Sequence, residues 1–356
     1  MNKEFWNNKR VLVTGHTGFK GSWLCLWLNK LGADVVGFSL APNTTPSLYE
    51  LSDVGSKIES HYGDIRDASH IKSVMKESKP EIVIHMAAQP LVLRSYEDPV
   101  ESYMTNVIGT ANVFEAIRET DTVKAVVNIT TDKCYENKEW HWGYRENEAF
   151  GGHDPYSSSK ACAELVTTTY RKCFFAEAGI QLASVRAGNV IGGGDWADNR
   201  LIPDLMRSIT AGEPVVIRSP KAIRPWQHVL EPIAGYINLA ERLCSEDGVQ
   251  YAEGWNFGPY DNDAQPVEWI LNKLCNKWGE GASWQLDDPN KVQLHEANYL
   301  KLDCSKARKE LQWEPLLGLD TALEWIVDWY RAYTSGQNVA DITLRQIRDY
   351  EELLNK

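Results

Sequence analysis

The sequence predicts an α/β protein in which a doubly wound parallel sheet is joined to a smaller, mixed C-terminal lobe. Short apolar runs alternate with helical segments from residue 10 onward, and a glycine-rich turn follows the first run. After Gly192 this alternation fades, which predicts a change of architecture. We place the sheet domain at 1–189 plus 228–258 and the smaller lobe at 190–227 plus 259–356.

Length and composition exclude several classes of protein. The 356 residues suffice for a large core, and the formal net charge of −12 argues against a nucleic-acid partner, which would need a basic face. No apolar run approaches the ~18 residues of a membrane span, and the first ten residues lack a signal-peptide core. Seven cysteines without a CxxC pair indicate reduced thiols in a cytoplasm, and we expect no metal site.

The first strand, 10–15, runs into a glycine-rich turn and a helix at 20–32. The turn reads GHTGFKG, with glycines in the spacing G-x-x-G-x-x-G. Such a turn lets backbone amides and a helix N-terminus approach a diphosphate, although an ordinary strand-to-helix turn is the alternative interpretation. The candidate cofactor residues in this segment are Gly15, Thr17, Gly18, Phe19 and Gly21.

The second strand, 34–40, bears on the choice of cofactor. A dinucleotide fold usually places an acidic residue near its end to hold the adenosine ribose, but here Ser39 occupies that region. There is no Lys or Arg between Leu31 and Ser56 to meet a 2′-phosphate, so the sequence favours NAD over NADP.

The third and fourth strands are expected at 58–65 and 81–89. Asp64 and Ile65 fall where the third strand ends, near an adenine. Ala87 and Ala88 end the fourth strand, where small side chains would let a cofactor lie close, or would serve plain packing. Asn106 is polar within an apolar helix and is either a cofactor contact or a satisfied buried amide.

The remaining elements follow from the same patterns. Trp325 and Trp329, four residues apart, predict one buried face of a C-terminal helix. The other expected elements are helices at 68–76, 99–118, 156–175, 200–209 and 231–243 and strands at 124–130, 214–217 and 255–258, with another strand beginning at 180.

The segment 128–160 contains the residues that look chemical. Thr131, Asp132 and Lys133 come where a buried strand stops. Tyr156 and Lys160 are four residues apart, which puts them on one face of a helix. A nearby ammonium favours the phenolate, so we expect Lys160 to lower the pKa of Tyr156. This pattern predicts a hydride-transfer site if a nicotinamide lies beside it.

Together and in order, these motifs resemble the extended short-chain dehydrogenases/reductases. The matching segments are TGHTGFKG, GDI, HMAAQP, NVIGTANV, TTD and the pair Tyr156 and Lys160. The segments RAGNVIGGGD, RPWQHV and WNFGP are similar to the nucleotide-sugar-modifying branch, and TTDKCYEN with GHTGFKGSWL most resembles the CDP-glucose 4,6-dehydratases. The resemblance covers nearly the whole chain and implies a Rossmann-type domain that binds NAD, with Gln89 among the cofactor residues.

The resemblance also implies catalytic roles. Tyr156 would take the proton from the sugar 4-hydroxyl, Lys160 would bond the nicotinamide ribose, and Thr131 would orient the 4-oxygen. Asp132 would protonate the departing 6-hydroxyl. Where dTDP-sugar dehydratases have a glutamate base, this chain has Lys133, which could be a base, an enolate stabiliser or a solvated strand-end charge.

For the substrate, CDP-glucose, the resemblance implies contacts from the later motifs. Asn189 and Arg224 would lie at the diphosphate, and Arg200 and Asn256 belong to the same sugar-nucleotide motifs. Cys134 is expected to be a buried thiol without a catalytic task. The family commonly forms homodimers through two helices per subunit, here 99–118 and 156–175, and a dimer of dimers is also compatible.

Two other functions compete with this interpretation. A nucleotide-sugar epimerase or decarboxylase would use Thr131, Tyr156, Lys160 and NAD in the same way but would not need an acid at Asp132. A non-catalytic NAD-sensing scaffold is permitted by the fold alone, but the intact Thr-Tyr-Lys set argues against it.

Overall fold

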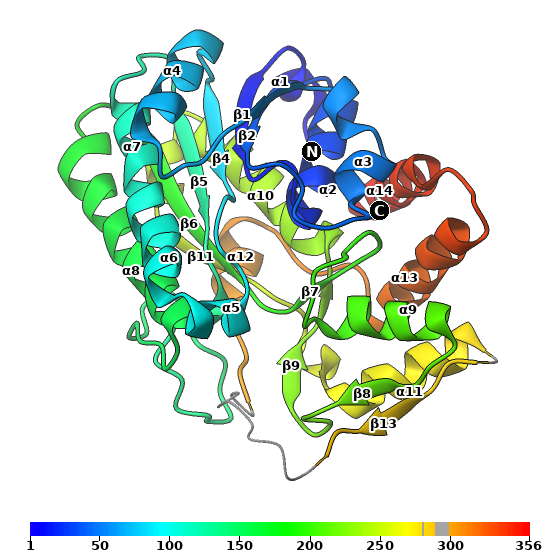
Figure 1. Ribbon diagram of the computed structural model, residues 1–356. Helices are drawn as coiled ribbons and strands as arrows, with labels where there is room; N and C mark the ends of the chain where they lie inside the picture. Colours follow the sequence, from blue (N-terminus) through cyan, green and yellow to red (C-terminus); the bar gives the residue numbers. More distant parts are fainter. Residues whose placement is uncertain (280, 289–298) are drawn as a thin grey trace.

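The computed structural model describes residues 1–279, 281–288 and 299–356, and its centre is a seven-stranded parallel sheet (Figure 1). The strand order is β11-β6-β5-β4-β1-β2-β3. This confirms the predicted doubly wound sheet. The strands are β1 (Arg10–Thr14), β2 (Asp34–Ser39), β3 (Glu59–Tyr62), β4 (Ile82–His85), β5 (Ala125–Ile129), β6 (Gln181–Ala187) and β11 (Gly254–Phe257).

The apolar strands bury both faces of this sheet. In β1, Leu12 points into one core while Val11 and Val13 point into the other, because successive side chains of a strand alternate between faces. All three are fully buried. A strand covered on both sides reads as a continuous apolar run, which is why the sequence located these strands.

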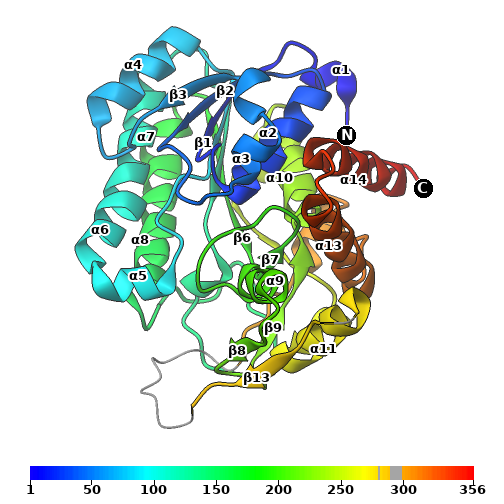
Figure 2. The ribbon, with the colours of Figure 1, turned by 45° about the vertical axis from the view of Figure 1, so that its right-hand side comes forward.

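Helices cover the two faces as separate layers (Figures 1 and 2). One layer holds α4 (Ala68–Ser78), α6 (Pro99–Tyr103), α7 (Thr110–Arg118) and α8 (Pro155–Tyr170); the other holds α2 (Phe19–Lys30) and α10 (Leu230–Leu243). The expected helices at 99–118 and 156–175 each contain a π-helical stretch, at Met104–Gly109 and Arg171–Phe175. Short helices are α1 (Lys3–Trp6), α3 (Leu48–Leu51), α5 (Val92–Glu97) and α12 (Ser305–Glu310).

The smaller lobe lies beyond the carboxyl ends of the strands (Figure 1). It contains α9 (Leu201–Ala211), α11 (Val267–Trp278) and three strand pairs. The pairs are β7 (Val190–Ile191) with β10 (Gln227–His228), β8 (Val215–Ile217) with β13 (Trp284–Leu286), and β9 (Ile223–Pro225) with β12 (Ala264–Pro266).

Two C-terminal helices, α13 (Leu319–Thr334) and α14 (Val339–Leu354), return the chain to the sheet domain. Helix α14 packs against α2, where Trp27 Nε1 donates to Glu351 Oε1 at 2.9 Å. Contacts therefore cross the predicted boundary at residue 259, and the division into domains stays a prediction. Trp329 on α13 is fully buried, as predicted, whereas Trp325, predicted on the same buried face, is half-buried.

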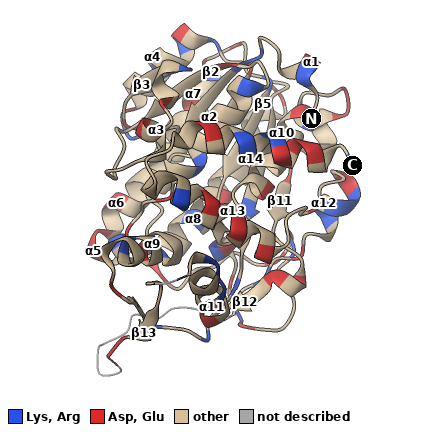
Figure 3. Ribbon diagram, turned by 90° about the vertical axis from the view of Figure 1, so that its right-hand side faces the viewer, with Lys and Arg blue, Asp and Glu red and all other residues tan. Residues whose placement is uncertain are grey.

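The ribbon in Figure 3 shows both acidic and basic residues on α13 and α14. Within the described residues, no helix is both long and apolar enough to cross a membrane.

Candidate active site

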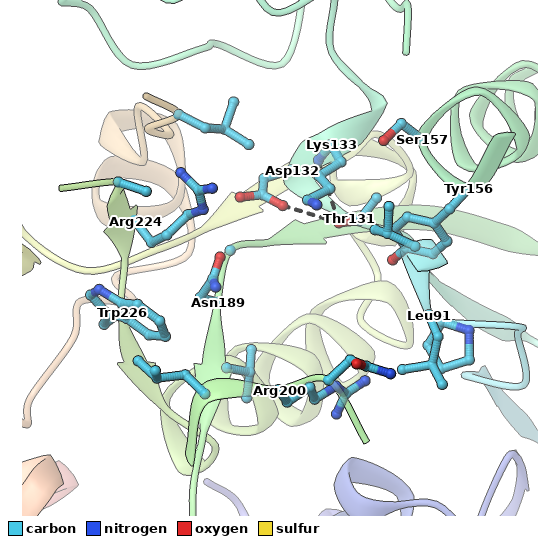
Figure 4. A pocket seen from close by; sticks show the side chains of 18 of the residues that line it. Leu91, Thr131, Asp132, Lys133, Tyr156, Ser157, Asn189, Arg200, Arg224 and Trp226 are labelled. Carbon is cyan, nitrogen blue, oxygen red and sulfur yellow. Dashed lines mark hydrogen bonds between the residues drawn. The ribbon is translucent and has the colours of Figure 1, made fainter. Parts of the chain in front are cut away.

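A cavity of about 980 Å³ lies between the carboxyl ends of the strands and the smaller lobe. Thr131, Asp132 and Tyr156 come from the sheet domain, and Arg200 and Arg224 from the lobe (Figure 4). Ligands of open α/β sheets bind outside the carboxyl ends of the strands, so this cavity is the candidate active site.

Thr131 and Asp132 occupy the turn that follows β5. The Thr131 hydroxyl caps a short 3-10 turn by accepting from the Lys133 N–H and donates to Asp132 Oδ1 at 3.0 Å. Asp132 is 3% exposed, and within the described structure its Oδ2 has no hydrogen-bond partner. Burial raises the pKa of Asp132, although Lys133, Thr131 and Arg224 each act to lower it. A buried carboxyl with a raised pKa is suited to donating a proton.

Helix α8 positions Tyr156 and Lys160. It begins with Asp154 as N-cap, which accepts from Ser157 N, and with Pro155 in its first turn. The Tyr156 N–H donates to Ser95 Oγ, and Lys160 Nζ donates to the Ile129 carbonyl at 3.2 Å. The helix start thus brings the Tyr156 ring beside Thr131 at the cavity (Figure 4).

The structure corrects the expected direction of the Tyr156 pKa. Burial raises it to about 12, while the Thr131 hydroxyl and Arg200 act to lower it and Asp132 acts to raise it. Burial also lowers the pKa of Lys160 to about 8. Desolvation was invisible in the sequence, and here it outweighs the charges around the phenol.

The glycine-rich turn has the close contacts expected of a diphosphate cradle. Gly15 has φ +77°, and a Cβ there would lie 2.8 Å from Ala87 N. A Cβ on Gly21 would lie 2.1 Å from the Gly15 carbonyl oxygen. Gly18 is the N-cap of α2, which begins at Phe19, so the first amides of α2 remain available to an anion.

The other candidate cofactor residues surround this turn in different ways. Thr17 and Ser39 are joined by a 2.9 Å hydrogen bond between their hydroxyls, which links the turn to the end of β2. Asp64 forms an ion pair with Arg66, which holds the pKa of that carboxyl below its usual range against the effect of burial. Ile65, the next residue in the chain, is buried.

Residues after β4 form a loop rather than the end of a longer strand. Ala87 N donates to Thr14 Oγ1, and Ala88 is half-buried in the same loop. Asn106 accepts from Gln89 N and donates to the Gln89 carbonyl and to Ser159 Oγ. Asn106 is thus a satisfied buried amide whose side chain fixes the loop and α8, and its contact with a cofactor stays a prediction.

The candidate substrate residues fall into two groups, those that line the cavity and one that is buried away from it. Asn189, Arg200 and Arg224 line the cavity, and Arg200 is paired with Asp195 Oδ2 at 3.0 Å. Asn256 is fully buried away from it, and its amide bonds the Tyr135 hydroxyl and the Tyr144 carbonyl. Its side chain therefore holds internal segments together and has no access to a ligand in the cavity.

Residues 12–325 match the family described as GDP-mannose 4,6 dehydratase. The chain belongs to this family. CDP-glucose 4,6-dehydratase of Salmonella typhimurium is 56% identical over 98% of each chain. A dTDP-glucose 4,6-dehydratase of Xanthomonas campestris is 25% identical over 90% of this chain and 92% of its own.

The chain shares its fold with solved structures. UDP-glucose 4-epimerase of Thermotoga maritima, solved with UDP-glucose, superposes with a TM-score of 0.78 at 21% identity, covering 91% of this chain and 99% of its own. The dTDP-glucose 4,6-dehydratase of Bacillus anthracis, solved with NAD, gives 0.74 at 20% identity, covering 93% and 99%. At these identities the superpositions establish the fold.

Several cavity residues went unnoticed in the sequence. Trp226 and Asp195 line the cavity, and so does Lys20, which follows Phe19 in the glycine-rich turn. A lysine at the start of an otherwise apolar helix was the available signal for Lys20.

Cys134 is fully buried, and burial raises the pKa of its thiol, in line with a structural role. No cluster of potential metal ligands occurs in the described ranges.

Proposed function

We propose that the protein is an NAD-dependent CDP-glucose 4,6-dehydratase, a hydro-lyase that forms CDP-4-keto-6-deoxy-D-glucose. The 56% identity to the Salmonella enzyme over 98% of both chains carries the assignment of the reaction and substrate. In the site itself, the supporting observation is Asp132, a buried carboxyl with an unpartnered oxygen beside the Thr131 hydroxyl.

Two residues that line the cavity, Tyr156 and Thr131, would serve the oxidation at carbon 4. Tyr156 would take the proton of the sugar 4-hydroxyl as a phenolate, which requires the positive charge of a bound nicotinamide ring to offset the burial that raises its pKa, and Thr131 would orient the 4-oxygen. NAD, when bound, would supply the hydride acceptor for the oxidation at carbon 4 and the hydride for the later reduction at carbon 6. Lys160 would hold the nicotinamide ribose from the same helix face as Tyr156.

Water leaves between oxidation and reduction. The ketone at carbon 4 acidifies the proton on carbon 5, and Asp132 gives a proton to the 6-hydroxyl as it departs. Lys133 lines the cavity beside Asp132 and serves either as the base at carbon 5 or as the stabiliser of the enolate. Lys133→Arg separates these roles, since arginine keeps the charge but cannot act as a base.

The cofactor diphosphate would lie over the turn of Gly15, Gly18 and Gly21, at the N-terminus of α2. The substrate diphosphate would lie between Asn189 and Arg224, with Arg200 nearer Tyr156. These assignments fit the distribution of cations around the cavity. Asn106 and Asn256 act by positioning neighbouring segments.

The competing functions make different demands on these residues. An epimerase or decarboxylase needs Thr131 and Tyr156 but has no use for a buried acid at Asp132. A scaffold that only senses NAD needs neither.

The product class, a 4-keto-6-deoxy sugar nucleotide, points to deoxysugar and lipopolysaccharide biosynthesis. The cytoplasmic location stays a prediction.

A homodimer is also part of this proposal. Val100, Met104 and Ile108 recur every four residues along α6 and the π-helical stretch after it, and all three are exposed. Leu165 on the neighbouring α8 is 55% exposed. Two such helix pairs could bury these side chains against each other. Ile108→Asp should then shift the protein toward monomers in sedimentation velocity.

The reaction is tested with CDP-glucose carrying deuterium on carbon 4. We expect a 4-keto-6-deoxy product with deuterium on carbon 6 and one solvent proton on carbon 5, observed by nuclear magnetic resonance. A 4-epimer of the sugar with deuterium still on carbon 4 would instead establish an epimerase and remove the role given to Asp132.

A further inference from the structure

Lys20 is a cation placed where the glycine-rich turn meets the cavity. It is the second residue of α2, two positions after the N-cap Gly18. Its side chain lines the cavity together with Thr131 and Tyr156. One residue therefore belongs both to the candidate diphosphate cradle and to the wall of the active site.

No residue in the described part of the chain supplies a direct counter-charge to Lys20. Within the described structure its ammonium makes no hydrogen bond or ion pair, whereas Arg200 is paired with Asp195 and Lys160 donates to the Ile129 carbonyl. Burial lowers the pKa of Lys20 to about 8; Arg200 and Lys160 lower it further, and the more weakly acting Asp132 and Asp195 raise it.

An ammonium held in a desolvating site among other cations is costly without an anion. The position of Lys20 narrows the choice of anion. The amides at the start of α2 attract a phosphate by themselves, and Lys20 extends from this same turn. The cations that act on it most strongly are Arg200 and Lys160, near the catalytic tyrosine.

We propose that Lys20 binds the diphosphate of the dinucleotide cofactor from the side that faces the substrate. This inference rests on the proposed cofactor site and adds a residue to it. The backbone amides of α2 would hold the diphosphate from one side, and the ammonium would hold it from the cavity side.

The test uses titration calorimetry on cofactor-stripped protein with three probes: NAD, ADP-ribose and CDP. ADP-ribose carries the cofactor diphosphate without the nicotinamide, and CDP carries the nucleotide diphosphate of the substrate. Lys20→Met should weaken NAD and ADP-ribose by about 10- to 100-fold, the usual effect of losing a charged hydrogen bond, and should change CDP by less than about twofold. Lys20→Arg should keep most of the affinity.

Lys72→Met is the matched control. Lys72 lies on α4 and forms an exposed ion pair with Glu119, so the substitution removes the same charge at a distant site. The ADP-ribose affinity of this variant should equal that of the wild type. Unchanged ADP-ribose binding by Lys20→Met, a loss confined to CDP, or an equal loss in Lys72→Met would each overturn the inference. A wild-type protein that binds no NAD would refute the proposed function itself, and this inference with it.

Discussion

The carboxylate of Glu164 and the guanidinium of Arg186 form a bidentate ion pair beneath the active site. Arg186 Nε donates to Glu164 Oε1 at 2.8 Å and its terminal nitrogen to Oε2 at 3.0 Å, with both side chains at most 3% exposed. Thr130 and Ser184 also donate to this carboxylate. The pair thus joins α8, which carries Tyr156 and Lys160, to the strand ends next to Thr131.

Breaking this pair should cost considerable stability. Burial raises the pKa of Glu164, but Arg186 and the hydroxyl donors outweigh it and lower the pKa, so the carboxyl is ionised. Glu164→Gln leaves the Arg186 charge buried without compensation, and we expect a loss of about 3–5 kcal/mol in urea unfolding. Glu164→Leu with Arg186→Met should regain much of that loss. A single variant as stable as the wild type would contradict this account.

Tyr156→Phe should reduce turnover by at least ~100-fold, a typical contribution of a general base. Affinity for NAD should be unchanged because the turn at Gly15 and Gly21 is untouched, and calorimetry can verify this. Tyr170→Phe on the same helix removes a hydroxyl that bonds Glu115 and is the control. Full turnover in Tyr156→Phe would exclude this residue from the mechanism.

Asp132→Asn should separate oxidation from water loss. Asparagine has nearly the shape of the acid but cannot give up a proton readily, so elimination should slow by about 100-fold or more. Hydride removal from carbon 4 uses Thr131 and Tyr156 and should continue, so reduced nicotinamide absorbance should build up in a single turnover. If this absorbance stays at the wild-type level while product forms normally, Asp132 is not the acid.

The end of β2 should make NAD bind more tightly than NADP. Ser39 is bonded to Thr17, and the nearby Lys57 donates to the Ser52 and Asp53 carbonyls, which removes it from a 2′-phosphate. Ser39→Arg should reduce the ratio of NAD affinity to NADP affinity by about tenfold, because it supplies a cation for the 2′-phosphate. Calorimetry with both cofactors measures the ratio, and tighter NADP binding by the wild type would contradict the prediction.

The sheet was predictable because each of its central strands is a short, continuous apolar run, as Val11 to Val13 illustrate. The catalytic residues were predictable because Thr131, Tyr156 and Lys160 lie close in sequence to recognisable strand and helix ends. The internal hydrogen bonds of Asn256 were not predictable, because its partners Tyr135 and Tyr144 lie 121 and 112 residues away in the sequence. The pKa of Tyr156 could not be foreseen either, because desolvation depends on what the fold packs around the ring.

The C-terminal helix was harder to place because a buried carboxylate on α10 attaches it. Glu231 Oε2 accepts from the Tyr350 hydroxyl of α14 at 2.6 Å, and Oε1 accepts from the N–H groups of Leu316 and Leu317. These donors come from a chain segment far along the sequence, so no local pattern announced them. Burial raises the pKa of Glu231 from 4.5 to about 7, although all three donors act to lower it.

This raised pKa makes stability depend on pH. Below pH 4.5 the group is protonated in both folded and unfolded chains, so its stabilising contribution is fully present. That contribution falls as pH rises and is lost once pH passes about 7, a change on the order of 3 kcal/mol. Glu231→Gln should flatten this decline between pH 5 and pH 8 in urea unfolding, because the amide does not ionise. Glu241→Gln on the same helix removes a carboxylate that bonds Trp6 and should keep the wild-type slope. An unchanged slope in Glu231→Gln would show that other groups govern the pH dependence.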